Sequence, residues 1–515
     1  MKNVKSIIAL GSAVAVLAGV LTAVLIINGN DGNEELPTEA EAVTVVSLCE
    51  NTHTENDVKR ITLENTLTAD SGKLTVVPSE EADEKFTILG YDEFRLDHAM
   101  LDGMAKTILE TELIPVTAQG EAEQYGFGAV PQYALFEFDD GEELKIFVGD
   151  QAPAIGQIYV QIDGGIYTAH TSKINAVLGG PGYYVSKVLI DVPEGENSGM
   201  QTMSIMRKDL DYAIVFEYDD ERKSDDKYTG GTSAAHVLKE PFFAYLDVTR
   251  SVDYTHNLFG VTADSIFILN PDAEDLALAG FGAAEQSRTV PDVSVIMETQ
   301  DGLCYRIELV KQQTGDMYFA RVYEQTQVQT NENTENLSQD ASREWKAHDL
   351  IYVMTEELFP WLNLQVKDVI SPLIIGEYFY ALKKADIKAE GEPDMVFNCT
   401  GTDKDDFFTS LNGSKEDCTD RFRAFYTFML NIASEEVYMP DEETGEPAGE
   451  PAAEIKVENI KGRTTELKFY KDGASKLIIQ VNGVTCFKCR ESLLEVLKGN
   501  MQMFGDEQKT FTVTW

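Results

Sequence analysis

Hydrophobic and polar residues alternate in short runs along most of this chain, and glycine, asparagine and aspartate separate the runs. The clearest case is YALFEFDDGEELKIFVGD, residues 133–150, in which two alternating runs flank Asp140-Gly141. An Asp-Gly pair between such runs is typical of a β-hairpin, because both residue types suit the positive φ angles of a tight turn. The pattern therefore predicts strands at residues 133–138 and 144–148, joined by a hairpin turn.

Helical spacing of apolar residues borders this β-rich stretch. Residues 97–111 carry five apolar side chains at helical spacing: Met100, Leu101, Met104, Ile108 and Leu109. Two further strands are predicted at residues 157–162 and 166–169, and Thr171 would cap a helix that follows them. The stretch is thus predicted to run from a helix through a meander of short strands to a second helix.

The same arrangement recurs later in the chain. The segment VNGVTCFKCRESLLEVLKG, residues 481–499, aligns without a gap with IDGGIYTAHTSKINAVLGG, residues 162–180, so that turn glycines and apolar helix positions coincide. A middle copy shows predicted strands at residues 293–297, 305–310 and 317–323. We therefore predict an α+β fold of three degenerate modules, each a small antiparallel meander sheet with flanking helices.

The N-terminal segment predicts where the protein resides. Lys2 and Lys5 precede an uncharged, mostly apolar run from Ile7 to Ile27. As a helix, this run would be about 31 Å long, close to the hydrocarbon thickness of a bilayer. It ends in Leu-Ile-Ile rather than in the small residues of a signal-peptide cleavage site. We therefore predict one uncleaved transmembrane helix, a single-pass location in the cell membrane, and an extracytoplasmic chain beyond it.

These patterns divide the chain into five predicted parts. They are a transmembrane anchor at residues 1–27, an acidic linker at residues 28–55, and three modules at residues 56–200, 201–375 and 376–515. The total of 515 residues also exceeds one ordinary hydrophobic core and suggests about three domains.

The charge balance excludes two classes of partner. The chain has 88 Asp and Glu residues against 42 Lys and Arg residues, which gives a formal net charge of −46. Nucleic acids and anionic lipid surfaces are bound through clustered Lys and Arg. We therefore predict no nucleic-acid partner, and we interpret the excess of acidic residues as a source of solubility.

Six cysteines are too sparse for a disulfide scaffold, and only Cys486 and Cys489 have the CxxC spacing. This pair is a candidate disulfide or dithiol, because a thiol near the start of a helix has a lowered pKa. The meander before it differs from the βαβ pattern of thioredoxin-like folds, so a local disulfide or a pair of buried thiols is the preferred interpretation. Cys399 and Cys418 flank a polar loop and could also pair. A zinc site is not expected, because the chain has no second CxxC.

Other motifs suggest structure rather than chemistry. Asp139-Asp140 and Glu142-Glu143 could hold calcium or act as acid and base, but a calcium-loop spacing is absent and turn residues explain them better. The chain has no HExxH, GxSxG, phosphate-loop or CxxCH motif. Six histidines are scattered along it: His53, His98, His170, His236, His256 and His348. We therefore predict a non-enzymatic protein with no catalytic, cofactor-binding or metal-binding residue. Aromatic residues in a predicted helix at residues 420–433 indicate burial, with a docking face for a membrane partner as the alternative.

Three segments of the first module resemble a known bacterial family. They are AEQYGFGAVP at residues 122–131, DDGEELKIFVGDQAP at residues 139–153 and YVQIDGGIYTAHTSKINAVL at residues 159–178. Together they are similar to the family called domain of unknown function 4340, although Phe127 and Phe281 replace its usual leucine and the third module lacks that element. The resemblance implies a membrane-anchored, outward-facing protein associated with ABC-type export systems, similar to the auxiliary subunits of gliding-motility transporters. It transfers no catalytic residue.

Two functions from different classes follow as expectations. The first is an accessory or scaffold subunit of an envelope transport complex, with membrane ABC transporter subunits as partners. The alternative is a cell-surface protein that binds a solute, glycan or peptide in a cleft between modules. A CxxC redox protein, acting through Cys486 and Cys489, is the third and least favoured hypothesis.

Overall fold

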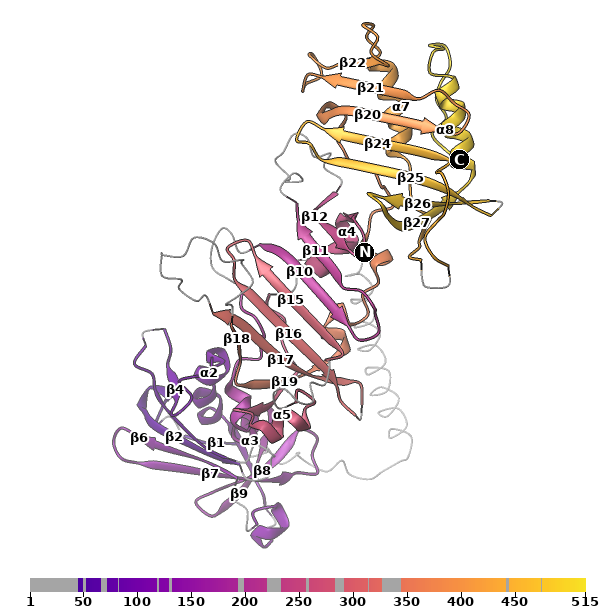
Figure 1. Cartoon of the computed structure of the whole chain (residues 1–515). Helices are drawn as coiled ribbons and strands as arrows, with labels where there is room; N and C mark the ends of the chain where they lie inside the picture. Colours follow the sequence, from indigo (N-terminus) through magenta and orange to yellow (C-terminus); the bar gives the residue numbers. More distant parts are fainter. Residues whose placement is uncertain are drawn as a thin grey trace, which may run out of the picture. The chain divides into compact units, whose positions relative to one another are not determined.

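A computed structural model describes residues 45–49, 52–65, 72–81, 83–117, 120–128, 132–192, 199–219, 233–255, 259–282, 291–313, 315–326, 344–440, 444–473 and 475–515. These residues build three antiparallel sheets that follow one another along the chain (Figure 1). They are called sheets one, two and three below.

Sheet one has nine strands in the order β1-β5-β9-β8-β7-β6-β2-β3-β4. Its strands are β1 (Val46–Ser47), β2 (Val58–Asn65), β3 (Gly72–Pro78), β4 (Phe86–Ile88), β5 (Glu112–Pro115), β6 (Tyr133–Phe138), β7 (Glu143–Gln151), β8 (Gln157–Ile162) and β9 (Gly165–His170). The predicted hairpin of β6 and β7 and the predicted strands β8 and β9 are confirmed. β1 falls within the stretch that was predicted as a linker and pairs with β5.

Sheet two has ten strands in the order β13-β12-β11-β10-β15-β16-β17-β19-β14, with β18 beside β17. Its strands are β10 (Met200–Arg207), β11 (Ile214–Tyr218), β12 (Ser233–Glu240), β13 (Ala244–Asp247), β14 (Ser265–Leu269), β15 (Val293–Thr299), β16 (Cys304–Lys311), β17 (Met317–Thr326), β18 (Glu344–Ala347) and β19 (Leu350–Thr355). β15, β16 and β17 confirm the three strands predicted for the middle copy.

Sheet three has eight strands in the order β22-β21-β20-β24-β25-β26-β27-β23. Its strands are β20 (Leu382–Ala389), β21 (Met395–Thr400), β22 (Phe408–Leu411), β23 (Glu436–Val437), β24 (Ala453–Asn459), β25 (Thr464–Asp472), β26 (Lys476–Val481) and β27 (Val484–Arg490). β26 and β27 occupy the same place in this sheet as β8 and β9 in sheet one, as the alignment of residues 481–499 with residues 162–180 predicts.

The three sheets share one strand order. β20-β24-β25-β26-β27-β23 in sheet three corresponds to β10-β15-β16-β17-β19-β14 in sheet two and to β2-β6-β7-β8-β9-β5 in sheet one. The turns at the tips of the last hairpins also match, because Asp163 and Gly164 have φ angles of 48° and 79° and Asn482 and Gly483 have φ angles of 50° and 85°. Three sheet-based modules are therefore consistent with the observed topology.

The predicted α+β class is wrong, because the fold is predominantly β. The described residues contain seven α-helices, most of them short: α2 (His98–Leu109), α3 (Thr171–Leu178), α4 (Val248–Thr255), α5 (Ala273–Leu278), α6 (Val366–Val369), α7 (Thr419–Leu430) and α8 (Ser492–Gln502). The prediction gave the flanking helices the same weight as the sheets. Alternation with a period of two covers far more of the chain than the helical spacing does, so the sheets provide most of the fold.

One helix-cap prediction is also wrong. Thr171 is the first residue of α3, and its buried hydroxyl has no hydrogen-bond partner within the described part of the chain. The hairpin turn at Asp140-Gly141 differs in detail from the prediction, since Gly141 alone of the two has a positive φ angle, at 87°. Gly141 N–H donates to Phe138 O at 3.1 Å, and Phe138 N–H donates to Glu142 O at 3.0 Å.

The transmembrane prediction needs a correction. Within the ranges that the structure describes, no helix combines the length and the apolar character needed to cross a bilayer. The run from Ile7 to Ile27, on which the prediction rested, lies outside those ranges.

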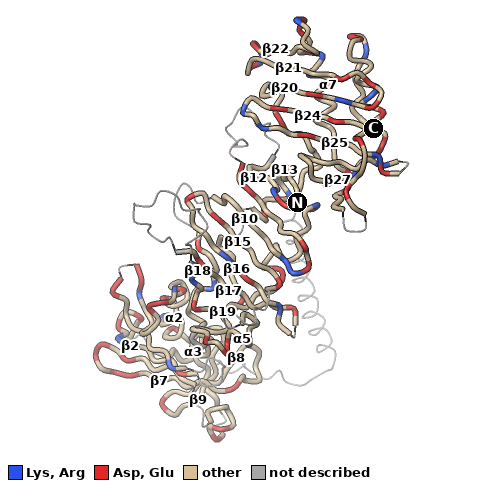
Figure 2. Tube along the Cα trace, in the orientation of Figure 1, with Lys and Arg blue, Asp and Glu red and all other residues tan. Residues whose placement is uncertain are grey.

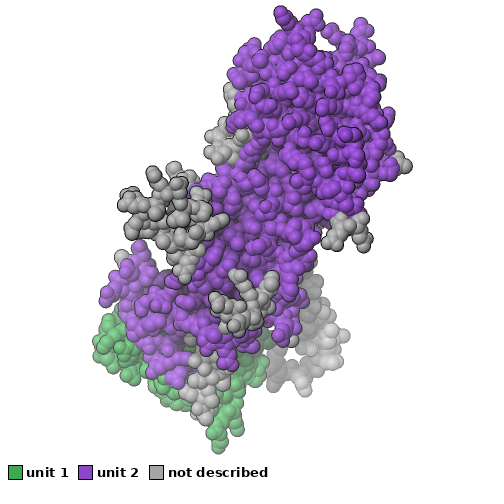
Figure 3. All heavy atoms as spheres, in the orientation of Figure 1, with its two compact units in different colours: residues 1–61, 104–177 green, residues 62–103, 178–515 purple. Residues whose placement is uncertain are grey.

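The chain divides into two compact units, shown in Figure 3. Unit 1 comprises residues 1–61 and 104–177, and unit 2 comprises residues 62–103 and 178–515. Sheets two and three both belong to unit 2. Asp and Glu positions are distributed over the strands and loops of all three sheets (Figure 2), so the acidic character is a property of the whole described chain.

Sheet three has an aromatic core that α7 closes. Phe422, Phe425, Tyr426 and Phe428 of α7 are each no more than 1% exposed. Phe422 stacks on Phe397 of β21 with ring centroids 4.1 Å apart. The aromatic residues predicted in this helix are therefore core residues and not a docking face.

Candidate ligand-binding groove

The core face of sheet two ends in a row of three polar side chains. The strand register places Tyr305 of β16, Glu324 of β17 and Lys346 of β18 side by side. Val322 and Ala320 precede Glu324 on the same face of β17, since alternate residues share a face, and both are fully buried. Glu324 itself is exposed. The face that packs the core therefore opens to solvent at this row.

Two segments form the opposite wall of the groove. One, residues 93–95, precedes α2, and the other, residues 186–191, follows α3. Ser186 N–H donates to Arg95 O at 2.8 Å, which joins the segments 93–95 and 186–191. The second segment is also held along its length, because Leu189 N–H donates to Val261 O and Gly260 N–H donates to Ile190 O, both at 2.8 Å. Backbone hydrogen bonds thus hold both segments of the wall in place.

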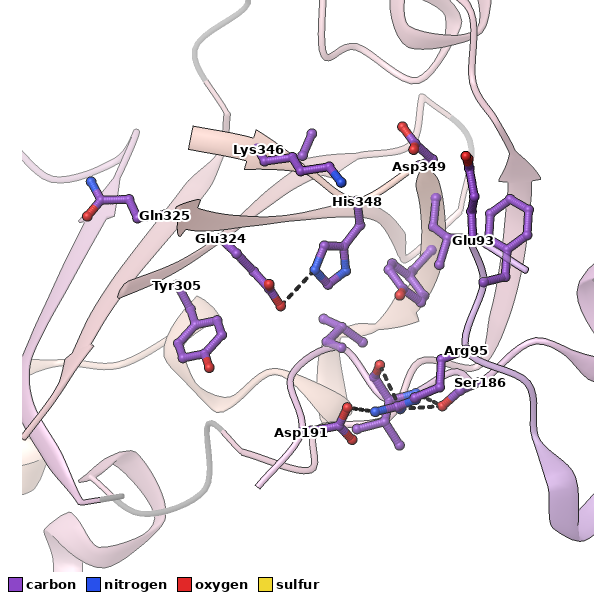
Figure 4. Close-up of a pocket in the computed structure, with 16 residues that line it drawn as sticks. Glu93, Arg95, Ser186, Asp191, Tyr305, Glu324, Gln325, Lys346, His348 and Asp349 are labelled. Carbon is purple, nitrogen blue, oxygen red and sulfur yellow. Dashed lines mark hydrogen bonds and ion pairs between the residues drawn. The ribbon is translucent and has the colours of Figure 1, made fainter. Parts of the chain in front are cut away.

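The space between row and wall is a groove of about 460 Å³ (Figure 4). This volume lies within the range of about 300–1,000 Å³ that is usual for sites of small ligands. The lining residues are Glu93, Phe94, Arg95, Ser186, Val188, Leu189, Asp191, Tyr305, Glu324, Gln325, Lys346, Ala347, His348, Asp349, Leu350 and Tyr352. All of them belong to unit 2.

A histidine and a carboxylate meet in the middle of the groove. His348, in the turn between β18 and β19, places Nε2 3.0 Å from Glu324 Oε1. This hydrogen bond, with the positive charge of Lys346, holds the pKa of Glu324 below its usual value against the opposing effect of burial. Glu324 is therefore an anion at neutral pH, and it keeps one side of the His348 ring oriented.

A second ion pair lies on the wall. The Arg95 guanidinium forms an ion pair with Asp191 and donates to Ser186 Oγ and, at 3.5 Å, to Val188 O. Both Arg95 and Asp191 remain partly exposed to the groove. In Figure 4 this pair lies on the other side of His348 from Lys346 and Asp349.

Two tyrosines supply neutral hydroxyl groups. Burial raises the pKa of Tyr352 to about 12, and it also raises the pKa of Tyr305. Both phenols therefore keep their protons at physiological pH, and the hydroxyl of Tyr305, which is the less buried of the two, can donate a hydrogen bond to a ligand. The groove thus combines aromatic surface, neutral donors and charges of both signs.

The groove residues do not form an acyl-transfer constellation. Ser186 is the one serine, threonine or cysteine among the described residues that line it, and its hydroxyl is bonded to Arg95 and to Val188 N–H. The base candidate, His348, is bonded to Glu324 instead. A nucleophile with its base within hydrogen-bond reach is the signature of covalent catalysis. The arrangement is better suited to holding a polar ligand.

The predicted cysteine pair lies elsewhere, in sheet three. Cys486 and Cys489 of β27 are free thiols that are no more than 1% exposed. Burial raises the pKa of Cys489 to about 12 and also raises that of Cys486, which opposes the thiolate form that redox chemistry requires. Cys399 and Cys418 are free as well, and both contact Thr409.

The acidic hairpin tip has a partner that sequence reasoning missed. His53 Nε2 lies 3.0 Å from Asp140 Oδ2 and 3.8 Å from Glu142 Oε2. These three residues form the one described group that could hold a metal ion. Of the predicted residues, Asp140 and Glu142 are therefore brought together, whereas Asp139 and Glu143 are not part of the group.

Comparisons with protein families, with curated proteins and with solved structures found no match for this chain.

Proposed function

We propose that this chain is a non-enzymatic binding protein that recognises an extended peptide segment in the groove of sheet two. One observation carries the proposal: the core face of the sheet opens at Tyr305, Glu324 and Lys346 into a groove that has charges of both signs on its two sides. A peptide offers side chains of both charges, whereas most sugars offer neither. The groove chemistry therefore favours a peptide over an uncharged glycan.

The neighbouring strand adds a second way to hold a peptide. β18 joins the sheet through β17 alone in the part of the chain that the structure describes, and Lys346 and Ala347 of this strand line the groove. A strand at a sheet edge presents backbone N–H and C=O groups that an extended peptide can pair with. Main-chain pairing would supply affinity, and the charged side chains would select the sequence.

Each charged group has a role in this proposal. Lys346 would pair with an acidic side chain or a terminal carboxylate of the peptide, and Glu93 and Asp349 would pair with a basic one. The His348–Glu324 pair and the Tyr305 hydroxyl would hydrogen-bond to the peptide amides between them. Arg95 and Asp191 are already paired, so they would shape the wall more than they select the ligand.

The accessory role implied by the family resemblance fits the same groove. An extended segment of a transport-complex subunit would be the peptide, and the protein would act as a scaffold by holding it. Partnership with ABC transporter subunits rests on the resemblance alone and stays a prediction.

The test is a selection of ligands from a random peptide library on the immobilised full-length chain, repeated on the Lys346→Gln variant. Lys388→Gln is the matched control, because Lys388 is an exposed lysine of β20 whose charge is paired with Glu454. We expect peptides with both an acidic and a basic residue to bind the wild type and the control. Their affinity for Lys346→Gln should fall about tenfold, which corresponds to about 1.4 kcal/mol.

Two outcomes would overturn the proposal. One is that the library yields no peptide with saturable binding to the wild type. The other is that the selected peptides bind Lys346→Gln as tightly as they bind the Lys388→Gln control. A glycan library screened in parallel would replace the peptide by a sugar if it gave saturable binding that depended on Tyr305.

A further inference from the structure

A second cluster of chemically active side chains lies at the tip of the β6–β7 hairpin in unit 1. It joins His53, which precedes the 3₁₀ helix at Glu55–Asp57, with Asp140 and Glu142 of the hairpin turn. The His53 Nε2 atom and one oxygen of each carboxylate all lie within 4.8 Å of one another. Neither the groove nor the proposed peptide binding uses these residues.

The histidine is held in position before any ligand arrives. Its ring stacks on Phe138 with centroids 4.0 Å apart and planes 15° apart, and its side chain is 10% exposed. Stacking leaves the imidazole little freedom to turn, and it directs Nε2 toward the carboxylates. A nine-tenths buried imidazole that faces two solvent-exposed carboxylates differs from an ordinary surface ion pair between two mobile side chains.

The carboxylates are arranged by the turn itself. Asp140 Oδ1 accepts the Glu142 N–H at 2.9 Å, which leaves Oδ2 pointing to His53. The two chain segments are tied together by Asp139 N–H, which donates to Asp57 O at 2.9 Å. The side chain of Asp57 is bonded to the backbone N–H and hydroxyl of Thr54, so it adds a fixed negative charge beside the cluster.

We propose that His53, Asp140 and Glu142 bind a divalent transition-metal ion of the zinc class. Zn²⁺ accepts imidazole nitrogen and carboxylate oxygen as ligand atoms, and three protein ligands leave a position for water. Ligand atoms of one tetrahedral zinc ion lie about 3.3 Å apart, given metal–ligand distances of about 2.0–2.1 Å. The exposed carboxylates can close the remaining distance by side-chain rotation, while His53 stays fixed.

The ion would act as a clip between the segment before β2 and the β6–β7 hairpin. The negative charges of Asp140, Glu142 and Asp57 raise the pKa of His53, with the hydrogen bond to Asp140 as the largest contribution. The imidazole must lose its proton to bind a metal. Zinc binding should therefore weaken as the pH falls.

The experiment measures zinc binding to the full-length chain after treatment with a chelator and dialysis. Isothermal titration gives affinity and stoichiometry, and its repetition at a lower pH measures the expected loss of affinity. Co²⁺ serves as a spectroscopic probe of nitrogen and oxygen coordination. The variants are His53→Gln and Glu142→Gln. Glu142 is a solvent-exposed residue, so its substitution should leave the fold intact.

The chain offers two matched controls. Glu143→Gln makes the same charge change one residue further along the hairpin, outside the cluster. His348→Gln removes a different histidine that is also paired with a carboxylate. We expect one zinc ion per wild-type chain, with an affinity that falls at least roughly tenfold in His53→Gln and Glu142→Gln and is unchanged in both controls. Equal affinity of all five proteins, or loss of binding in His348→Gln instead of His53→Gln, would overturn the proposal.

Discussion

Sheets two and three share a strand order, yet one is open and the other closed at corresponding positions. Tyr305, the second residue of β16, lines a groove of about 460 Å³. Thr465, the second residue of β25, is 1% exposed and donates its hydroxyl to Glu377 Oε1 at 2.7 Å. Near Thr465 the remaining cavity is about 150 Å³. The same strand order thus leaves an open groove of about 460 Å³ in sheet two and a smaller cavity of about 150 Å³ beside sheet three.

The two places also differ in the ion pairs that the segments beside β25 and β16 form. Beside β25, Arg463 binds Asp219 through two hydrogen bonds, and Asp219 is 6% exposed. Beside β16, the segments 93–95 and 186–191 stay on the far side of the groove and pair with each other through Arg95 and Asp191. Arg463 and Asp219 thus join a residue beside β25 to a residue that follows β11, whereas Arg95 and Asp191 both belong to one wall of the groove.

The strongest test of the closed sheet is a cavity in its core. Phe422→Ala should lower the free energy of unfolding by about 3–5 kcal/mol, because the ring is fully buried against Phe397. Tyr305→Ala in the open groove should cost only about 1 kcal/mol. Urea unfolding followed by circular dichroism measures both. Equal losses from the two substitutions would show that the groove end is packed as tightly as the core of sheet three.

The reactivity of Cys486 and Cys489 provides a second test of the closed packing of sheet three. Burial raises the pKa of Cys489 from an ordinary value of 9.0 to about 12, so the native protein should hold roughly a thousandfold less of its thiolate at pH 8 than the unfolded chain. Iodoacetamide followed by mass spectrometry should label Cys486 and Cys489 in urea and leave them unlabelled in buffer. Rapid labelling of the native chain would contradict a closed sheet three and revive a dithiol function.

The ion pair between Arg463 and Asp219, beside β25, should contribute to the stability of the fold. Arg463→Gln should cost about 2 kcal/mol of stability, since it leaves a nearly buried carboxylate without its cation. Lys383→Gln is the control, because Lys383 forms an exposed pair with Glu458 and should cost less than about 1 kcal/mol. If both variants lose the same small amount of unfolding free energy, the Arg463–Asp219 pair does not stabilise the fold more than an exposed ion pair does.

The smallest expected effect concerns pH in the groove. The folded pKa of Glu324 is lowered, so its bond to His348 adds stability above the ordinary pKa of 4.5, and this is lost as the pH falls through the folded value. Glu324 is half-exposed, so the contribution should be below about 1 kcal/mol. Glu324→Gln should therefore reduce the stability difference between pH 6 and pH 3. An unchanged difference would mean that the pair does not form in solution.

Local patterns predicted much of this fold. The β6–β7 hairpin, β8, β9 and the helix α2 follow from spacing within single segments, and the alignment of residues 162–180 with residues 481–499 predicted two corresponding strand pairs. The α+β class was wrong because helix spacing at the module borders was given too much weight. The cap at Thr171 was wrong because a threonine before apolar residues can also be the first helical residue.

The functional residues could not be predicted in the same way. Tyr305, Glu324 and Lys346 come from three strands, and their juxtaposition depends on strand register, which loop lengths and distant packing determine. His53 and Asp140 are 87 positions apart, and no ligand spacing links them. An aromatic residue such as Phe138 before an acidic turn was the one local signal at the hairpin tip, because it offers a stacking surface for a ring from elsewhere.

A charge swap in the groove tests the central claim most directly. Lys346→Glu is titrated with a peptide selected on the wild type and with a second peptide in which the acidic residue is replaced by lysine. If the groove binds peptides through Lys346, the substitution should weaken the first peptide at least about tenfold and the second peptide should recover most of the affinity. Equal binding of the first peptide to wild type and variant would contradict the account.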